Sequence, residues 1–196
     1  QVPSNDPSSL KQGTTSNYNN ATKQFVGKSA IPDLVGGFGF DLTVHGVTLS
    51  SAFSFGLGGY GYDGAYATLM DPSSAIGSSN WHKDILDSWS PTNTNGSLPI
   101  LGSNASELSQ ATSRSTRFLT SRSYLNLSNV RISYDLPKSL VKHVGLERAS
   151  VYVSGDNLFL ISARKGFVSM SSSSGSSSSN RYLPMSTITA GVQIKL

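Results

Sequence analysis

The chain has 196 residues, of which only 13% are charged, and its net charge is +4. Lysine and arginine form no basic run, so the sequence gives little support for nucleic-acid binding. The absence of cysteine excludes disulfides and thiolate metal sites. No apolar stretch is long enough to form a transmembrane helix.

The first 33 residues are polar and show no signal-peptide pattern. We therefore expect the chain to begin inside a longer protein, and we assign residues 1–33 to a loop.

Apolar residues then alternate with small or polar ones over residues 37–44 and 47–57, and this pattern predicts strands at about 34–44 and 47–57. A period of two places every second side chain on the same side of a strand. One side carries large apolar groups, and the other carries glycine, hydroxyls and one carboxylate. His45-Gly46 joins the two runs, and a two-residue turn that contains glycine predicts a β-hairpin.

Residues 58–122 form a long gap before the next alternating run. The gap contains an aromatic and glycine-rich stretch at 60–64 and a helical segment from about Trp81 to Trp89. Aromatic rings can stack on sugar rings or pack against a covering protein. The candidate ligand or lid contacts are Tyr60, Tyr62, Trp81 and Trp89. Packing within the loop, or at a membrane interface, is the commoner role of such residues.

Three further strands are predicted, at about 123–136, 149–160 and 185–196. The apolar side changes within the first of them near Ser128-Asn129, as a β-bulge would cause. Proline at 137 and glycine at 145 predict a short helical turn between the first two strands. Residues 161–184, which include a serine run, are predicted to be a second long loop.

Clean two-faced strands with a small, polar second face are typical of an outer-membrane β-barrel, whose apolar side chains face lipid. We therefore predict an all-β fold, a transmembrane antiparallel barrel to which this chain supplies five strands. The smallest such barrels need about eight strands, and an open edge is not tolerated in lipid. The remaining strands should come from outside this sequence. Because long loops lie outside the cell, residues 1–33, 58–122 and 161–184 are expected to be extracellular and the two short connections periplasmic.

No arrangement for covalent chemistry is found. His45, His82 and His143 lack metal-ligand spacing, and no serine lies in a nucleophile-elbow motif. We expect neither a cofactor, nor a metal site, nor enzymatic activity.

Four blocks resemble motifs of SusC/RagA-type TonB-dependent transporters, in the same order and with similar spacing. They are PDLVGGFG at 32–39, RFLTSRSYLNLSNV at 117–130, YDLPKSL at 134–140, and VYVSGDNL at 151–158 with KGF at 165–167. Two features depart from the family pattern. The last residue is Leu196 rather than an aromatic, and serines replace the acidic run after Phe167.

The resemblance implies that the chain is the C-terminal segment of such a transporter, supplying the last five strands of a plugged barrel of about 22 strands. It implies location in the Gram-negative outer membrane, a SusD-like surface lipoprotein as a lid, and energy from TonB–ExbB–ExbD. The substrates would be oligosaccharides or oligopeptides. This chain would then contribute barrel wall and surface loops, in contact with the lipid bilayer and with the rest of the barrel.

Two other readings stay open. One is a passive porin-type barrel, which a plug and TonB box in the full protein would exclude. The other is a soluble β-sandwich adhesin or lectin, which would partition into buffer without detergent.

Overall fold

The computed structural model describes residues 17–71, 80–98, 100, 110, 113–167, 176–177 and 184–196. Most of the serine run lies outside them. The chain divides into two compact units. The sheet unit comprises residues 31–59, 121–171 and 182–196, and the loop unit comprises residues 1–30, 60–120 and 172–181.

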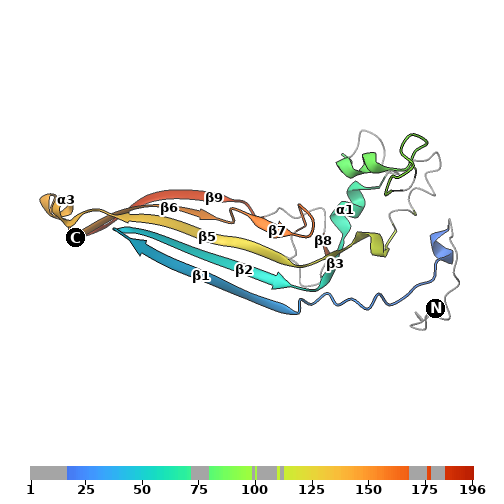
Figure 1. Ribbon diagram of the computed structural model, residues 1–196, viewed down its shortest axis with the longest axis horizontal. Helices are drawn as coiled ribbons and strands as arrows, with labels where there is room; N and C mark the ends of the chain where they lie inside the picture. Colours follow the sequence, from blue (N-terminus) through green and yellow to red (C-terminus); the bar gives the residue numbers. More distant parts are fainter. Residues whose placement is uncertain are drawn as a thin grey trace. The chain divides into compact units, whose positions relative to one another are not determined.

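The sheet unit is an antiparallel sheet with strand order β1-β2-β5-β6-β9 (Figure 1). The bounds are β1 (Leu34–Val44), β2 (Val47–Leu57), β5 (Tyr124–Asp135), β6 (Arg148–Asp156) and β9 (Thr187–Lys195). Each strand is followed in space by the next of these strands in sequence, so the sheet is a simple meander. A short strand, β7 (Leu160–Ser162), also pairs with β5.

The predicted hairpin is confirmed by the pairing of β1 with β2, from Leu34 opposite Leu57 to Val44 opposite Val47. His45 and Gly46 both have positive φ, 49° and 85°. A two-residue turn with positive φ at both positions matches the twist of the strands that it joins.

The predicted bulge is confirmed in β5. Ala52 pairs with Asn129 and Phe53 pairs with Leu127, so Ser128 has no partner in β2. The extra residue changes the phase of the alternation and keeps apolar side chains on one face along the whole strand.

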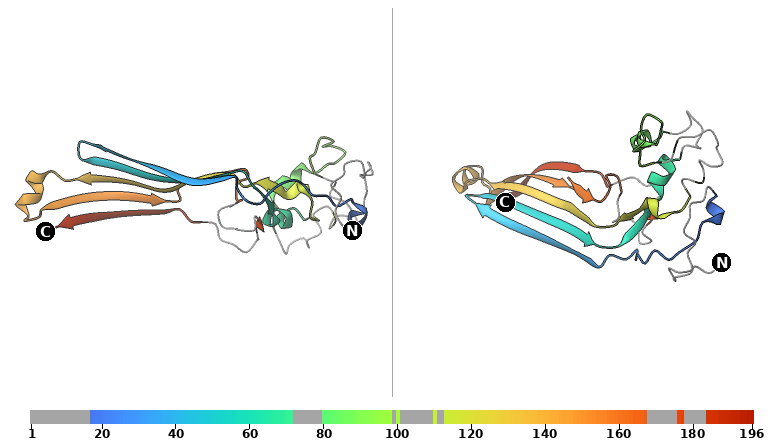
Figure 2. Two further views of the ribbon diagram at one scale, coloured as in Figure 1. Left: turned by 90° about the horizontal axis from the view of Figure 1, so that it is seen from below. Right: turned by 45° about the vertical axis from the view of Figure 1, so that its right-hand side comes forward.

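Helix α3 (Lys138–His143) connects β5 to β6, in the place where the sequence predicts a helical turn. It lies at the same end of the sheet as the β1–β2 turn (Figure 2). Val141 is only 3% exposed and anchors the turn. In the described part of the chain, no helix has the length and apolar character needed to cross a bilayer.

The single strand predicted at 149–160 is wrong, because β6 ends at Asp156 and β7 is a separate strand. Asn157 has a positive φ of 51°, which breaks the extended backbone. Its N–H donates to the Ser128 carbonyl (3.2 Å), and its side-chain oxygen accepts from Asn126 Nδ2 (3.2 Å). The bulge in β5 and the break after β6 are therefore tied together.

The loop unit contains more regular structure than the sequence predicted for residues 58–122 and 161–184. Its elements are η2 (Tyr18–Asn20), β3 (Tyr60–Asp63), α1 (Gly64–Leu69), η3 (Lys83–Asp87), η4 (Thr116–Phe118), β4 (Leu119–Ser121) and β8 (Ser176–Ser177). Strand β3 lies between β4 and β8. The helical segment expected from Trp81 to Trp89 is the shorter 3-10 helix η3.

A small core holds the loop unit together. Ala67, Met70, Ile85 and Phe118 are buried, and Phe118 is only 1% exposed. Asp63 caps α1, because its carboxylate accepts from the Tyr66 N–H at 3.0 Å.

Candidate functional site

One face of the sheet unit is apolar across all five long strands. A single row of cross-strand partners runs Leu42, Leu49, Ile132, Val153 and Ala190. Such direct partners share a face of the sheet. Leu42, Ile132 and Val153 are 57%, 54% and 51% exposed. Other large apolar residues on this face are at least half exposed, namely Leu34, Phe38, Phe40, Val44, Leu57, Ile161, Ile188, Val192 and Ile194.

Soluble monomers rarely expose a continuous apolar surface of this kind. Aromatic packing reinforces it, because the rings of Phe38 and Phe53 are stacked with their centroids 4.8 Å apart. This face therefore suits an apolar surrounding, such as lipid hydrocarbon.

The opposite face is polar, and several of its charged side chains have hydrogen-bond or ion-pair partners. Arg148 forms two hydrogen bonds with the Asp135 carboxylate, at 2.6 and 3.2 Å. The Asp156 carboxylate accepts from Asn129 Nδ2 at 2.7 Å. At the end of the sheet, Lys195 pairs with Glu147 at 2.8 Å.

Sequence reasoning missed one arrangement on the polar face. The guanidinium of Arg131 lies 3.8 Å from the centroid of the Tyr152 ring. Only the register of β5 against β6 could have predicted this contact. Arg131 is opposite Ser154, and Tyr152 is opposite Ser133. The two long side chains are therefore diagonal neighbours on one face. That register depends on the bulge, which the sequence places only approximately.

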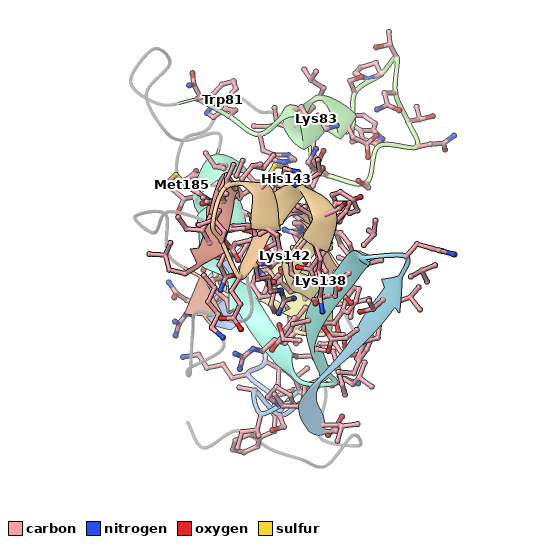
Figure 3. All side chains as sticks on the ribbon, turned by 90° about the vertical axis from the view of Figure 1, so that its left-hand side faces the viewer. Trp81, Lys83, Lys138, Lys142, His143 and Met185 are labelled. Carbon is pink, nitrogen blue, oxygen red and sulfur yellow. The ribbon has the colours of Figure 1, made fainter. Side chains whose placement is uncertain are left out.

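Helix α3 presents a mixed surface at its end of the sheet (Figure 3). Lys138, Lys142 and His143 are exposed there. Leu140 and Val144 are exposed beside them, by 62% and 70%. Basic and apolar groups on one short turn suit a water–membrane interface.

The four aromatic candidates do not form one cluster. Tyr62 packs against the core of the loop unit, with its ring edge-on to Phe118 at 6.1 Å. Burial is the main cause that raises the pKa of the Tyr62 hydroxyl. The Tyr60 ring lies under Lys28 Nζ at 4.6 Å. Trp81 and Trp89 flank η3 and are 37% and 40% exposed. Among the described residues, neither tryptophan ring contacts the Tyr60 or Tyr62 ring.

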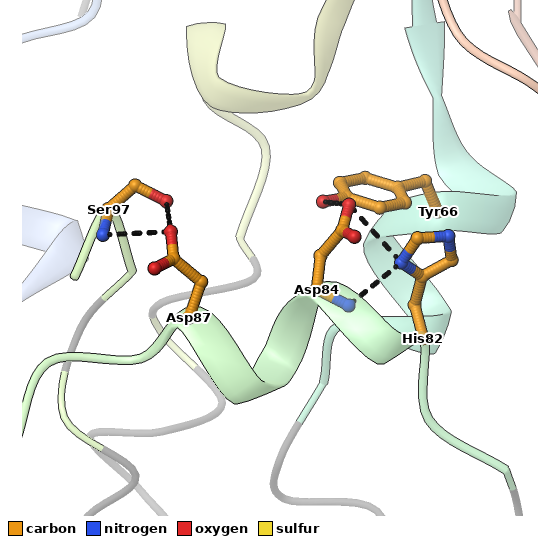
Figure 4. A network of polar contacts seen from close by, with 5 residues as sticks. All are labelled: Tyr66, His82, Asp84, Asp87 and Ser97. Atoms are coloured by element: carbon orange, nitrogen blue, oxygen red, sulfur yellow. Dashed lines mark hydrogen bonds and ion pairs between the residues drawn. The ribbon is translucent and has the colours of Figure 1, made fainter. Parts of the chain in front are cut away.

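A polar network holds η3 in place (Figure 4). The Tyr66 hydroxyl donates to Asp84 Oδ2 at 2.9 Å, and the same oxygen lies 3.2 Å from His82 Nδ1. The Tyr66 and His82 rings meet edge to face at 4.9 Å. These contacts link α1 to η3, and among the described residues no metal-ligand group of three or more side chains is found.

The turn after η3 should loosen in acid. The Asp87 carboxylate accepts from Ser97 Oγ (2.5 Å) and Ser97 N (3.2 Å), and the hydroxyl bond is the main cause that lowers the pKa of Asp87. A lowered folded-state pKa stabilises the turn above the ordinary carboxyl pKa, and this contribution is lost as the pH falls through the lowered value. Hydrogen-exchange protection of the Ser97 amide, relative to the intrinsic rate, should therefore decrease between about pH 6 and about pH 3. Ser97→Ala should weaken this dependence, and equal protection at both pH values would contradict it.

No protein-family model matches the chain. The chain is 30% identical over 138 residues to TonB-dependent receptor P3 of Formosa agariphila, an alignment that covers 70% of this chain and 13% of that relative. It is 27% identical over 132 residues to TonB-dependent receptor P26 of the same organism, covering 67% of this chain and 13% of that relative. The chain thus spans only a small part of these relatives' length.

Solved structures share the fold. The chain superposes on a chain of the RagAB peptide importer in the "open-open" state with a TM-score of 0.73 at 24% identity, covering 97% of this chain and 20% of that one. For the "closed-closed" state the TM-score is 0.71 at 24% identity, covering 92% and 19%. The strand order, the two-faced sheet and the relatives agree with the sequence motifs. The chain belongs to the family of TonB-dependent receptors and corresponds to a part of such a protein.

Proposed function

We propose that this chain forms part of the barrel wall and surface loops of a TonB-dependent transporter in a Gram-negative outer membrane. The observation that carries the proposal is the apolar face, which crosses five strands and leaves Leu42, Ile132 and Val153 more than half exposed. In a barrel this face contacts lipid, and the small polar face lines the interior. The role is structural and transport-related, with no enzymatic step.

The proposal also explains the two edges of the sheet. Within the described residues, β1 pairs only with β2, and β9 pairs only with β6. An unpaired edge at membrane depth costs several kcal/mol for each unsatisfied backbone group. We assign the missing partners to other strands of the same barrel, which close it into about 22 strands.

The whole transporter would import oligosaccharides or oligopeptides, with a SusD-like lipoprotein as its lid and TonB–ExbB–ExbD as its energy source. The "peptide importer" name of the structural neighbours supports a peptide for those proteins. The sequence relatives are named receptors without a substrate. For this chain both substrate classes remain in the proposal.

The loops would meet the lid or the substrate on the outside of the cell. Residues 1–33, 58–122 and 161–184 are assigned to that side, and the β1–β2 turn and α3 to the periplasm. Among the aromatic candidates, Trp81 and Trp89 suit a contact better than Tyr62, because their rings are partly exposed and Tyr62 packs into the core. Tyr60 keeps one ring face occupied by Lys28.

Cysteine labelling in the full-length transporter tests the orientation. Leu86 is 82% exposed on η3, and Ser139 is exposed on α3. Leu86→Cys should react with a membrane-impermeant maleimide on intact cells. Ser139→Cys should react only after the outer membrane is permeabilised. The reverse pattern would invert the topology, and equal labelling of both on intact cells would argue against a membrane-spanning wall.

A further inference from the structure

Among the cations that the structure describes on the polar face, Arg131 is the one without an ion-pair partner. Arg131 lies near the middle of a row of direct cross-strand partners, Asp41, Ser50, Arg131, Ser154 and Thr189. The carboxylate in this row, Asp41, is two strands away. No ion pair joins Arg131 to any carboxylate of the described residues.

The Tyr152 ring packs between the Arg131 side chain and the backbone of the sheet. Gly191 is opposite Tyr152 in the pairing of β6 with β9. The Tyr152 ring lies over this glycine so closely that an added Cβ would come within 2.6 Å of the Tyr152 hydroxyl oxygen. The Arg131 guanidinium in turn stacks on Tyr152 at 3.8 Å. Gly191, Tyr152 and Arg131 therefore form three layers on the wall.

This support leaves the guanidinium oriented for binding. Stacking uses one flat face of the group and leaves the N–H groups at its edge free to donate. The hydroxyl-bearing residues Ser50 and Ser154 are its two direct neighbours across the strands. A planar fork of N–H donors matches a carboxylate, which it can bind through two parallel hydrogen bonds.

We propose that Arg131 is a carboxylate-binding position on the inner wall of the barrel. This inference rests on the proposed function, since the polar face must line the barrel interior. The two other cations on this face are in ion pairs: Arg148 pairs with Asp135, and Lys195 pairs with Glu147. An unpaired cation in a confined interior favours an anionic partner more strongly than the same cation in bulk water. The carboxylate comes either from an acidic side chain elsewhere in the full protein or from an imported molecule.

Zero-length cross-linking of the full-length transporter tests the site. Arg131→Lys places an amine there, and a water-soluble carbodiimide joins an amine to a carboxylate only when the two are in contact. Products are mapped by mass spectrometry, first without added ligand and then with a tripeptide of glutamate. An N-acetylated, C-terminally amidated tripeptide of glutamine is the probe without a carboxylate. Thr43→Lys is the matched control, because it places an amine on the same face in a different row.

We expect the Arg131→Lys amine to give about tenfold more cross-linked product than the Thr43→Lys amine, as charge-assisted contact predicts. A product with an acidic residue outside the described sheet, formed without ligand, identifies an internal source. A product with the glutamate tripeptide alone identifies an imported source. A product with Asp41 only, or none with either source, overturns the proposal.

An internal standard separates this outcome from failure of the proposed function. Lys195 Nζ and Glu147 Oε2 are 2.8 Å apart and should cross-link in every variant with a folded sheet. If this product forms and the Leu86 and Ser139 labelling shows the expected topology, absence of a product at position 131 rejects the carboxylate site and leaves the transporter assignment intact. If the Leu86 and Ser139 labelling does not show the expected pattern but the amine at position 131 still gives a cross-linked product, the proposed topology is rejected instead.

Discussion

Arginine in place of Ile188 should lower the free energy of unfolding of the full-length protein by about 2–4 kcal/mol. Ile188 is 75% exposed on the apolar face and is opposite Gly155 in β6. Its row continues through Val130 and Ser51 to Phe40, which lies near the middle of β1. Because direct cross-strand partners share a face, Ile188 is on the face that the proposal places against lipid, where a charge is costly. Denaturant titration of the protein in phospholipid vesicles measures the change.

Thr189→Arg is the matched control, since it puts the same side chain one residue further along β9 on the polar face. A position that faces the barrel interior keeps the guanidinium in water, so the loss should stay below about 1 kcal/mol. Equal losses for the two variants would mean that the two faces of the sheet meet the same surroundings. The lipid-facing assignment would then be wrong.

The strands could be predicted because alternation is a local signal. The pattern at 34–44 and 47–57 gives both the strands and the two-residue turn between them. The break at Asn157 could not be found in this way. It depends on contacts with Asn126 and Ser128 in β5, about 30 residues earlier in the chain. A pattern of apolar residues does not contain that information.

The loop unit was harder to predict for a different reason. Its helix α1 has 6 residues and η3 has 5, too few for a helical period to show. Its core joins Ala67, Ile85 and Phe118, which are far apart in sequence. The same limit applies to the candidate site. Tyr62 was selected as an aromatic in a loop, whereas its packing against Phe118 depends on tertiary contacts.

Phe118→Ala should give the largest loss of stability within the loop unit, about 3–5 kcal/mol. The Phe118 side chain is 1% exposed and meets the rings of Tyr62 and Tyr66, each with centroids 6.1 Å away. Removing the ring takes away its buried apolar surface and leaves a cavity between β3 and α1. Hydrogen exchange of the full-length protein should therefore show loss of protection in residues 60–69 and 83–87.

The effect should be confined to the loop unit, because the recorded ring contacts of Phe118 are with Tyr62 and Tyr66. Leu86→Ala is the control, since Leu86 is 82% exposed and its truncation should change stability by no more than about 0.5 kcal/mol. Unchanged protection in the Phe118→Ala protein would mean that this core does not hold α1 and η3 together. Trp81 and Trp89 would then lack the rigid support that a lid or substrate contact needs, because both flank η3.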